Sequence, residues 1–350
     1  MKNIHFFCCK NGFGHLKRIL MVTKQLANLT DSKIFIYTTT NHIKKISTWK
    51  EFSFFFESPN LHLSNIMDCY PSYNEDFENR YLYDSLTYIS DNLKINSCND
   101  VVILDNDVSL LQIFNNAILM GSFLWGEIFS ETEHQELKIL SANEKSLLKK
   151  FYPQMICVDK MAMSWISEYT RKIGLPWFCS LSDQRNRNFS DRDGILITGG
   201  GTGKITDDLL EIYFYFDYHS ENVFADELIY NSVTKKGKPA KLFQFDEESF
   251  LNLKAIICRP GLGIITDSVN YSIPIAAVVE SENSEMIHNA HCIVKYNFGT
   301  KIGSDNENKS QILYEWLYSK NIIQNYRSLL KETGSGDIKA AEFILSNIKG

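Results

Sequence analysis

Hydrophobic residues occur in short runs along the chain, and each half of the chain opens with the same order of elements. The first half has an apolar run over 4–9, a polar loop with two glycines, and apolar residues at helical spacing from Leu16. The second half has an apolar run over 195–198, a glycine loop over 199–203 and a helical pattern from Ile205. Short buried strands that alternate with amphipathic helices predict βαβ units and a mostly parallel sheet.

The rest of the chain continues this alternation. In the first half, a helix is expected over 42–49, and strands are expected at 34–37, 52–56, 101–104, 117–120, 154–158 and 177–179. In the second half, helix and strand signals alternate through 224–225, 241–245, 255–258 and 275–279, and an amphipathic helix is expected at 338–348. The stretch 58–99 has no clean period, and it predicts loop with a helix around 81–93.

The most polar run of the chain, 182–193, separates the two halves and has the composition of an interdomain linker. A length of 350 residues also favours two domains. We therefore expect an α/β protein with Rossmann-like domains over 1–185 and 190–335, whose parallel sheets face each other across a cleft. The C-terminal helix, 336–350, is expected to pack back on the first domain.

Composition and charge exclude several classes of protein. The net charge of −6 argues against a general nucleic-acid binder, which needs a basic surface. None of the eight cysteines forms a C-x-x-C pair, and several lie in apolar runs, as free cysteines do in a reducing compartment. No signal-peptide pattern and no apolar run of membrane-spanning length is present. We expect a cytoplasmic protein, and peripheral contact with the inner membrane face remains open.

The first candidate site is the loop Asn-Gly-Phe-Gly-His over 11–15. Glycines such as Gly14 let the backbone turn sharply near a ligand, and the helix that follows offers unpaired N–H groups. His15 stands where the carboxyl ends of parallel strands form a crevice, and it can take a proton from a hydroxyl group or from water. The alternative is a helix-capping loop with a solvated histidine.

The glycine loop over 199–203 is the second candidate. Four glycines in five residues after a strand can wrap a phosphate, although the spacing is not that of a Walker A loop. An ordinary glycine-rich turn is the alternative.

The segment 258–268 is the third and most informative candidate. Its helix-start N–H groups around 263–265 can bind a diphosphate. Asp267 lies about one turn into the helix, where a carboxylate can accept hydrogen bonds from ribose hydroxyls, and Glu285 and 288–290 are expected to line the same cleft. The alternative is an ordinary loop whose aspartate interacts with the helix dipole.

Metal binding is poorly supported, because the eight histidines are scattered. The Asp-Asn-Asp run over 105–107 has D-x-D spacing and is interpreted as the polar end of a strand. The aromatic run over 123–129 can receive an apolar acceptor or can belong to the core. We expect neither a metal nor another cofactor.

All three of these loops resemble a known superfamily, and Gly199, Gly200 and Thr202 match the glycine loop of its second domain. Arg-Pro-Gly-Leu-Gly-Ile-Ile-Thr-Asp (259–267), Ile-Pro (273–274), Glu285 and Asn-Ala (289–290) resemble the donor-sugar motif of the GT-B glycosyltransferases. The relatives most similar are those of family 28, which resemble the peptidoglycan lipid-linked N-acetylglucosaminyltransferase. The run Gly-Phe-Gly-His-Leu-Lys-Arg (12–18) is similar to the N-terminal loop of the same superfamily. It is also similar to the loop of the nucleotide-sugar hydrolase of pseudaminic acid synthesis.

The resemblance implies roles for individual residues. His15 is implied as the base or transition-state stabiliser, and Asp267 falls where the family has a glutamate that binds ribose. Glu285 and Met286 stand where the family often has two glutamines, and backbone near 244–245 is the expected reader of the base. The residues implied to bind the nucleotide sugar are Gly14, Gly199, Gly200, Thr202, Phe245, Arg259, Gly261, Gly263, Ile264, Ile265, Thr266, Asp267, Glu285 and Asn289.

The function implied is that of a metal-independent glycosyltransferase of the hexosyltransferase type. Its donor is expected to be a nucleoside-diphosphate sugar, with UDP as the first choice. The acceptor is expected to be a hydroxyl group in glycan, glycolipid or secondary-metabolite synthesis, on a glycan, lipid-linked or small-molecule partner. A nucleotide-sugar hydrolase that uses water and a non-catalytic nucleotide-sugar-binding protein are the alternatives.

Overall fold

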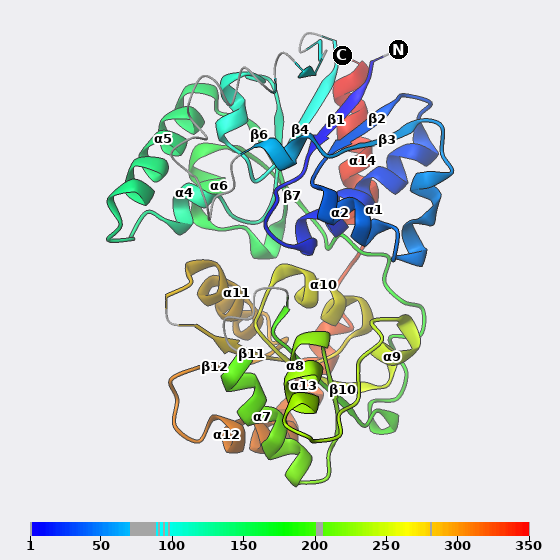
Figure 1. The fold of residues 1–350 in the computed structure, drawn as a ribbon, viewed down its shortest axis with the longest axis vertical. Helices are drawn as coiled ribbons and strands as arrows, with labels where there is room; N and C mark the ends of the chain where they lie inside the picture. The colour runs from blue at the N-terminus through cyan, green and yellow to red at the C-terminus, as the bar shows by residue number, and fades with distance from the viewer. Residues whose placement is uncertain are drawn as a thin grey trace. The chain divides into compact units, whose positions relative to one another are not determined.

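The computed structural model divides the chain into two compact units (Figure 1). Unit 1 comprises Met1–Phe178 and Gly336–Gly350, and unit 2 comprises Cys179–Ser335. The residues that the structure describes are 2–70, 89, 92, 93, 95, 96, 99–200, 206–280 and 282–349. The helix expected around 81–93 falls almost wholly outside these residues.

Within the described residues, unit 1 is built on a parallel sheet of seven strands in the order β3-β2-β1-β4-β5-β6-β7. The strands are β1 (Ile4–Phe7), β2 (Ile34–Tyr37), β3 (Leu61–Ser64), β4 (Val101–Asp105), β5 (Ile118–Met120), β6 (Gln154–Val158) and β7 (Arg171–Leu175). The helices are α1 (Phe13–Leu29), α2 (Thr40–Ile46), α4 (Trp125–Ile128), α5 (Gln135–Phe151), α6 (Ser164–Tyr169) and α14 (Gly336–Lys349). Short 3-10 helices are η1 (Lys50–Phe56), η2 (Ile66–Cys69), η4 (Ser109–Gln112) and η5 (Asp159–Met161).

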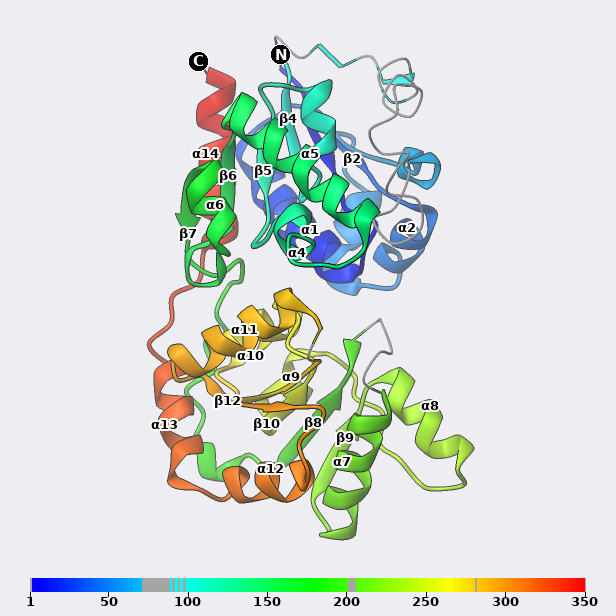
Figure 2. The same cartoon turned by 90° about the vertical axis from the view of Figure 1, so that its left-hand side faces the viewer.

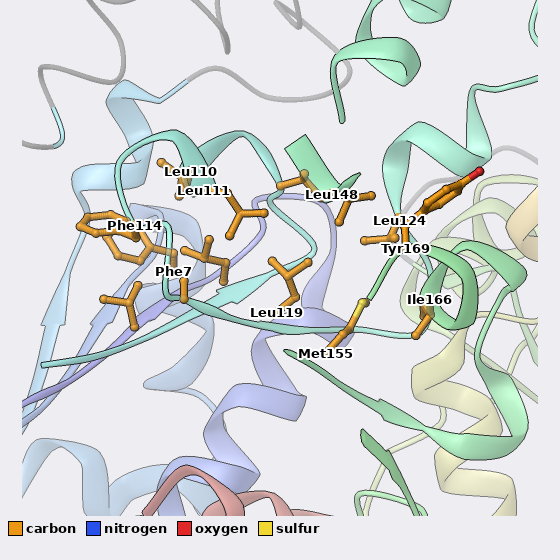
Figure 3. Packing of buried hydrophobic residues seen from close by; sticks show 14 of the residues in the cluster. Phe7, Leu110, Leu111, Phe114, Leu119, Leu124, Leu148, Met155, Ile166 and Tyr169 are labelled. Carbon is orange, nitrogen blue, oxygen red and sulfur yellow. The ribbon is translucent and has the colours of Figure 1, made fainter. Parts of the chain in front are cut away.

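Helices cover both faces of this sheet. Alternate strand residues such as Leu104 and Leu119 pack with Leu148 of α5 and Ile166 of α6, forming one apolar cluster (Figure 3). On the other face, α1 and the C-terminal helix α14 pack against each other (Figure 1). Gln25 of α1 donates a hydrogen bond to Asp337 at 2.8 Å, which joins these two helices.

Two strands expected from the sequence are wrong. The run 52–56 is part of the 3-10 helix η1, and the third strand is β3. Phe52 and Phe55 are buried whereas Phe56 is exposed, which is a period of three. The run 177–179 is not a strand but a crossing between the units. Its three consecutive apolar side chains are buried, and the backbone N–H groups of Ser335 and Gly336 donate to the carbonyl groups of Cys179 and Trp177.

In the described residues of unit 2, a parallel sheet of five strands has the order β12-β11-β10-β8-β9. The strands are β8 (Gly194–Thr198), β9 (Asn222–Ala225), β10 (Leu253–Cys258), β11 (Ile275–Val279) and β12 (Gly299–Gly303). The helices are α7 (Thr206–Tyr218), α8 (Glu227–Lys235), α9 (Glu247–Leu251), α10 (Leu262–Tyr271), α11 (Ser284–Lys295), α12 (Lys309–Leu317) and α13 (Lys320–Leu329), with the 3-10 helix η6 (Phe189–Asp191). The run 241–245 forms only one β-bridge, between Leu242 and Ala225.

The core of unit 2 is also built from alternate strand residues. Ile195, Ile197 and Ile257 pack with Phe216 of α7 and Leu313 of α12 in one apolar cluster. The α10 and α11 helices lie beside each other (Figure 2). The α7 helix confirms the helix expected after the glycine loop. The β10 and β11 strands confirm the strands expected at 255–258 and 275–279.

Both sheets have a topological switch point beside their first strand. In unit 1, β1 lies between β2 and β4, and in unit 2, β8 lies between β9 and β10. The loops after neighbouring strands diverge at such a point and leave a crevice, where ligands of open α/β sheets bind. No helix in the described part of the chain is long and apolar enough to cross a bilayer.

Candidate functional site

The loop between β1 and α1 places His15 at the switch point of unit 1. Gly12 has φ +83°, which a glycine adopts without strain, and the helix begins at the next residue. Gly14 and His15 therefore lie in the first turn of α1. Gly14 is exposed and His15 is mostly buried, with 13% of its side chain accessible.

The imidazole of His15 is hydrogen-bonded to a buried carboxylate. Asp105 is the last residue of β4, the neighbour of β1, and its side chain is fully buried. Val102 and Leu104 face the α5 cluster, so the alternation of the strand directs Asp105 toward α1. The distance from His15 Nδ1 to Asp105 Oδ2 is 2.9 Å.

Charged and polar neighbours keep this carboxylate ionised. Burial alone raises the pKa of Asp105, but the positive charge of Arg18 and the hydrogen bonds from His15 and Arg18 outweigh it. They lower the pKa of Asp105 to about 2. An ionised carboxylate only accepts hydrogen bonds, so His15 Nδ1 is the donor, and in the neutral imidazole Nε2 is then the nitrogen with the lone pair. That nitrogen can accept a proton from a substrate.

A second histidine near His15 stays neutral. The distance from His42 Nδ1 to the hydroxyl oxygen of Thr38 is 2.6 Å, and the ring lies against Phe13. Burial, together with the nearby His15, lowers the pKa of His42 to about 4. His42 therefore adds no positive charge to the neighbourhood of His15 at neutral pH.

A run of aromatic side chains begins at the imidazole of His15. The ring of Phe123 meets the imidazole edge to face, with 5.9 Å between centroids. Trp125 packs on Phe123, and Phe129 stacks on Trp125 at 5.7 Å. Phe123 is buried while Trp125 and Phe129 are half-buried, so this run contributes both to the core and to an apolar surface.

Acid should weaken folding through Asp105. Its pKa in the folded state, about 2, is below the value of about 3.9 in an unfolded chain, so its contribution to stability is present above pH 4. That contribution is lost as pH falls through 2. Between pH 5 and pH 2, wild type should lose about 2 kcal/mol more unfolding free energy than Asp105→Asn. Urea denaturation at both pH values measures this, and equal losses would contradict it.

In unit 2, the end of β8 carries the glycine loop. Gly200 has φ +67°, a conformation that favours glycine. The N–H of Gly199 donates to the buried carboxylate of Asp226 at 2.8 Å, and the hydroxyl group of Thr198 donates to the same oxygen at 2.8 Å. Asp226 also caps α8, so it fixes the start of the loop. Thr202 lies outside the described residues.

The segment after β10 leads directly into α10. Gly261 occupies the N-cap position without a side-chain hydrogen bond, and the first turn has no acidic residue. The first amides of a helix lack intrahelical acceptors and lie at the positive end of its dipole. The N–H of Ile265 donates to the carbonyl of Gly261 at 3.2 Å, and its side chain is buried. The amides that remain for an anion are therefore those of 262–264.

Two further residues of this segment are already hydrogen-bonded. The hydroxyl group of Thr266 donates to the carbonyl of Leu262 at 2.8 Å. Arg259 forms an ion pair with Glu280, which follows β11, and its backbone N–H donates to the carbonyl of Thr198. Arg259 thus joins the ends of β8, β10 and β11. Asp267 is half-buried in the second turn of α10.

The α11 helix supports this loop. Its Asn289 is buried and donates from Nδ2 to the carbonyl of Pro260 at 2.9 Å. Asn289 therefore stabilises the turn before α10. This contact joins residues 29 positions apart, so it could not be predicted from the sequence alone. Glu285 is half-buried in the first turn of α11, and Met286 is buried.

Phe245 follows the bridge between Leu242 and Ala225. It has φ +48°, and 49% of the residue is exposed. Its ring contacts Phe243 and Phe250 edge to face, so the aromatic group is held by packing while one side meets solvent. An exposed aromatic surface of this kind can stack on a nucleobase.

The structure brings most of the predicted residues of unit 2 to one edge of its sheet. The loops after β8 and β10 follow neighbouring strands, and α11 bonds to the second loop. His15 and Gly14 belong to unit 1. Asp105 and Arg18 are the residues that the sequence reasoning missed. The D-x-D run at the end of a strand was the sequence signal for Asp105. The signal for Arg18 was its spacing of three from His15, which places both residues on the same face of a helix.

The described residues contain no group of three or more His, Cys, Asp or Glu side chains that could hold a metal ion. No known protein-family profile matches the sequence, and no curated protein matches it.

Solved structures do match over the whole chain. One is LpCGTa in complex with UDP, with a TM-score of 0.66, 12% identity, and 100% of this chain and 99% of that chain covered. Another is UGT89C1 from Arabidopsis thaliana complexed with quercetin, with a TM-score of 0.67, 11% identity, and 99% of each chain covered. The calicheamicin glycosyltransferase CalG4 matches with a TM-score of 0.61, 12% identity, and 99% of this chain and 98% of that chain covered.

The chain has the GT-B fold. The expected α/β class with two parallel sheets is confirmed, since the matches extend through both units. At identities of 11–12% the likeness establishes the GT-B fold alone. The chemistry must therefore be argued from the residues of this chain.

Proposed function

We propose that this protein is a glycosyltransferase that moves a sugar from a nucleoside-diphosphate donor to an acceptor hydroxyl group. The observation that carries the proposal is the hydrogen bond between His15 and the buried Asp105 at the switch point of a GT-B sheet. This bond selects the tautomer of the imidazole with the proton on Nδ1, so that Nε2 is the nitrogen that can act as the base in deprotonation of a hydroxyl group.

The proposed reaction uses a different feature in each unit. His15 Nε2 takes the proton of the acceptor hydroxyl group, and the acceptor oxygen forms a bond to the anomeric carbon of the sugar. The bond from that carbon to the diphosphate oxygen breaks, and its electron pair stays on the diphosphate. The amides of 262–264 at the start of α10 stabilise this developing charge without a metal.

The resemblance of 259–267 to a donor-sugar motif supports a nucleoside-diphosphate sugar as the donor. UDP is the nucleotide that we propose. LpCGTa, of the same fold, was solved with UDP, and another neighbour, VinC, with dTDP. In our proposal Asp267 binds the ribose hydroxyls and Phe245 stacks on the base. In the same proposal, Glu285 and the loop that Asn289 holds contact the sugar, and the hydrogen bond from Asn289 to Pro260 supports this role of the loop. The half-buried Trp125 and Phe129 favour an acceptor with an apolar or aromatic group.

A panel of nucleotide sugars, with and without an acceptor extract, tests this function. Free UDP and free sugar are measured separately. We expect UDP release that depends on the acceptor, with little free sugar. Equal release of UDP and free sugar without acceptor would show a hydrolase, and binding without turnover would show a sensor; either result would contradict the transferase.

Removing the carboxylate of Asp267 should weaken nucleotide binding. Loss of charge-assisted hydrogen bonds to ribose costs about 1–3 kcal/mol, so the Kd for UDP of Asp267→Ala should rise by roughly 5–150-fold. Calorimetric titration measures the affinity. Asp193→Ala, which removes an exposed carboxylate of the same unit, is the matched control and should bind UDP as wild type does. Unchanged affinity in Asp267→Ala would remove this residue from the site.

A further inference from the structure

Arg18 lies one helical turn after His15 on α1, and only 9% of its side chain is accessible. We propose that Arg18 is a positioning residue, which orients the carboxylate of Asp105 and offsets its negative charge so that His15 remains a neutral base. This inference rests on the proposed function for the role of His15. Arg18 itself need not touch substrate.

The contacts of Asp105 show how Arg18 acts on orientation. A guanidinium nitrogen of Arg18 donates to Oδ1, while Oδ2 accepts from His15 Nδ1 at 2.9 Å and from the backbone N–H of Cys9 at 3.3 Å. Each carboxylate oxygen thus has at least one donor, and the three donors come from α1 and from the loop after β1. This arrangement fixes the plane of the carboxylate and, through it, the orientation of the imidazole ring.

The charge of Arg18 opposes that of Asp105 at the imidazole. A buried carboxylate alone favours a positively charged histidine, which cannot accept a proton. The same guanidinium nitrogen of Arg18 lies 3.3 Å from His15 Nδ1, where its positive charge disfavours protonation of the ring. Arg18 and Asp105 together carry no net charge, so the ring is oriented by the carboxylate without being held protonated.

The other titratable groups around His15 do not replace Arg18. His42 of α2 has a pKa lowered to about 4 by burial and by His15 itself. Cys8, directly after β1, has a pKa raised well above the usual thiol value by burial and by Asp105. Both groups are uncharged at pH 7. Neither group therefore adds charge to that of Arg18 and Asp105 at the imidazole.

Titration of His15 by NMR in Arg18→Gln tests the proposal. Glutamine can still donate a hydrogen bond to Asp105, but it carries no charge. The imidazole of His15, assigned with a His15→Gln variant, should take up its proton at a pH higher than in wild type by on the order of one unit. The acidic limb of the pH profile of kcat/KM should move by the same amount in the same direction.

Lys24→Met is the matched control. Lys24 is exposed on the same helix, so its replacement removes one positive charge that solvent already screens. The titration of His15 should then move by no more than about 0.2 units. An unchanged titration in a folded Arg18→Gln protein would overturn the proposal and leave Arg18 with a packing role alone.

A double variant covers the case in which Arg18→Gln does not fold. Asp105→Asn/Arg18→Met leaves neither charge unpaired, and it is compared with Asp105→Asn alone. Because Arg18 repels a protonated imidazole, His15 should take up its proton at a higher pH in the double variant than in Asp105→Asn. The same titration pH in both variants would overturn the proposal. The titration of His15 needs no substrate, so it tests the role of Arg18 even in a protein that binds no nucleotide. Failure to bind any nucleotide would contradict the proposed function and would leave the result for Arg18 intact.

Discussion

Replacing His15 with alanine is expected to lower kcat by about 10²–10⁴-fold, which is the usual contribution of a positioned general base. The affinity for UDP should stay within a few-fold of wild type, because in the proposed reaction the diphosphate contacts the start of α10 in unit 2. Steady-state kinetics and calorimetric titration of UDP measure the two effects separately.

His134→Ala is the control for the histidine substitution. His134 is an exposed residue of unit 1 before α5, and its side chain makes no capping hydrogen bond. Its replacement should change neither kcat nor UDP affinity. Equal loss of turnover and UDP affinity in His15→Ala would contradict the role of His15 as a base, since it would indicate damage to the fold or to nucleotide binding.

The second large effect is expected in Asp105→Asn. Asparagine has nearly the same shape, but its neutral side chain no longer selects the tautomer of His15 with the proton on Nδ1. In a serine protease the corresponding change lowers kcat by about 10⁴-fold, and we expect a loss of about 10³–10⁴-fold here. UDP affinity should again be nearly unchanged.

Asp107→Asn is the matched control for Asp105→Asn. Asp107 lies two residues further along the chain, is also buried, and accepts a hydrogen bond from Ser109. If the catalytic effect is specific to the bond with His15, kcat of Asp107→Asn should remain within a few-fold of wild type. Similar losses in both variants would show that any buried charge of this loop is needed for folding, and that Asp105 has no special role.

Most of the strand-and-helix order could be predicted from the sequence. The strands at 34–37, 154–158 and 275–279 coincide with β2, β6 and β11, because these runs are fully apolar or nearly so and end at polar residues. The strand predictions were wrong where the apolar residues belong to another kind of element, or where a strand contains polar residues. In 52–56 the buried positions repeat every three residues, and β3 was missed because its four residues include a histidine and a serine.

The partners of His15 could not be predicted with the same ease. Asp105 is 90 residues away in the sequence, and it meets His15 only because β1 and β4 are neighbours in the sheet. Strand order depends on contacts across the whole unit, which local periodicity does not contain. The interpretation of the Asp-Asn-Asp run as the polar end of a strand is confirmed by β4, but nothing in the local sequence indicates that Asp105 reaches His15 of α1.

The residues of unit 2 were easier to group, because they follow one another in the sequence. The motif over 259–267 spans the turn and the start of α10. What the sequence did not show is which atoms are already hydrogen-bonded. The amide of Ile265, the hydroxyl group of Thr266 and the side chain of Asn289 all have partners within the protein. The nucleotide-sugar roles proposed for the remaining residues stay predictions.

Hydrogen exchange with and without UDP tests the central claim most directly. The account predicts that saturating UDP slows exchange of the amides over 261–267 at the start of α10. Exchange within α12, on the opposite side of the same sheet, should be unchanged. A protein that binds UDP but shows no added protection over 261–267, or that binds no nucleoside diphosphate, would contradict the account.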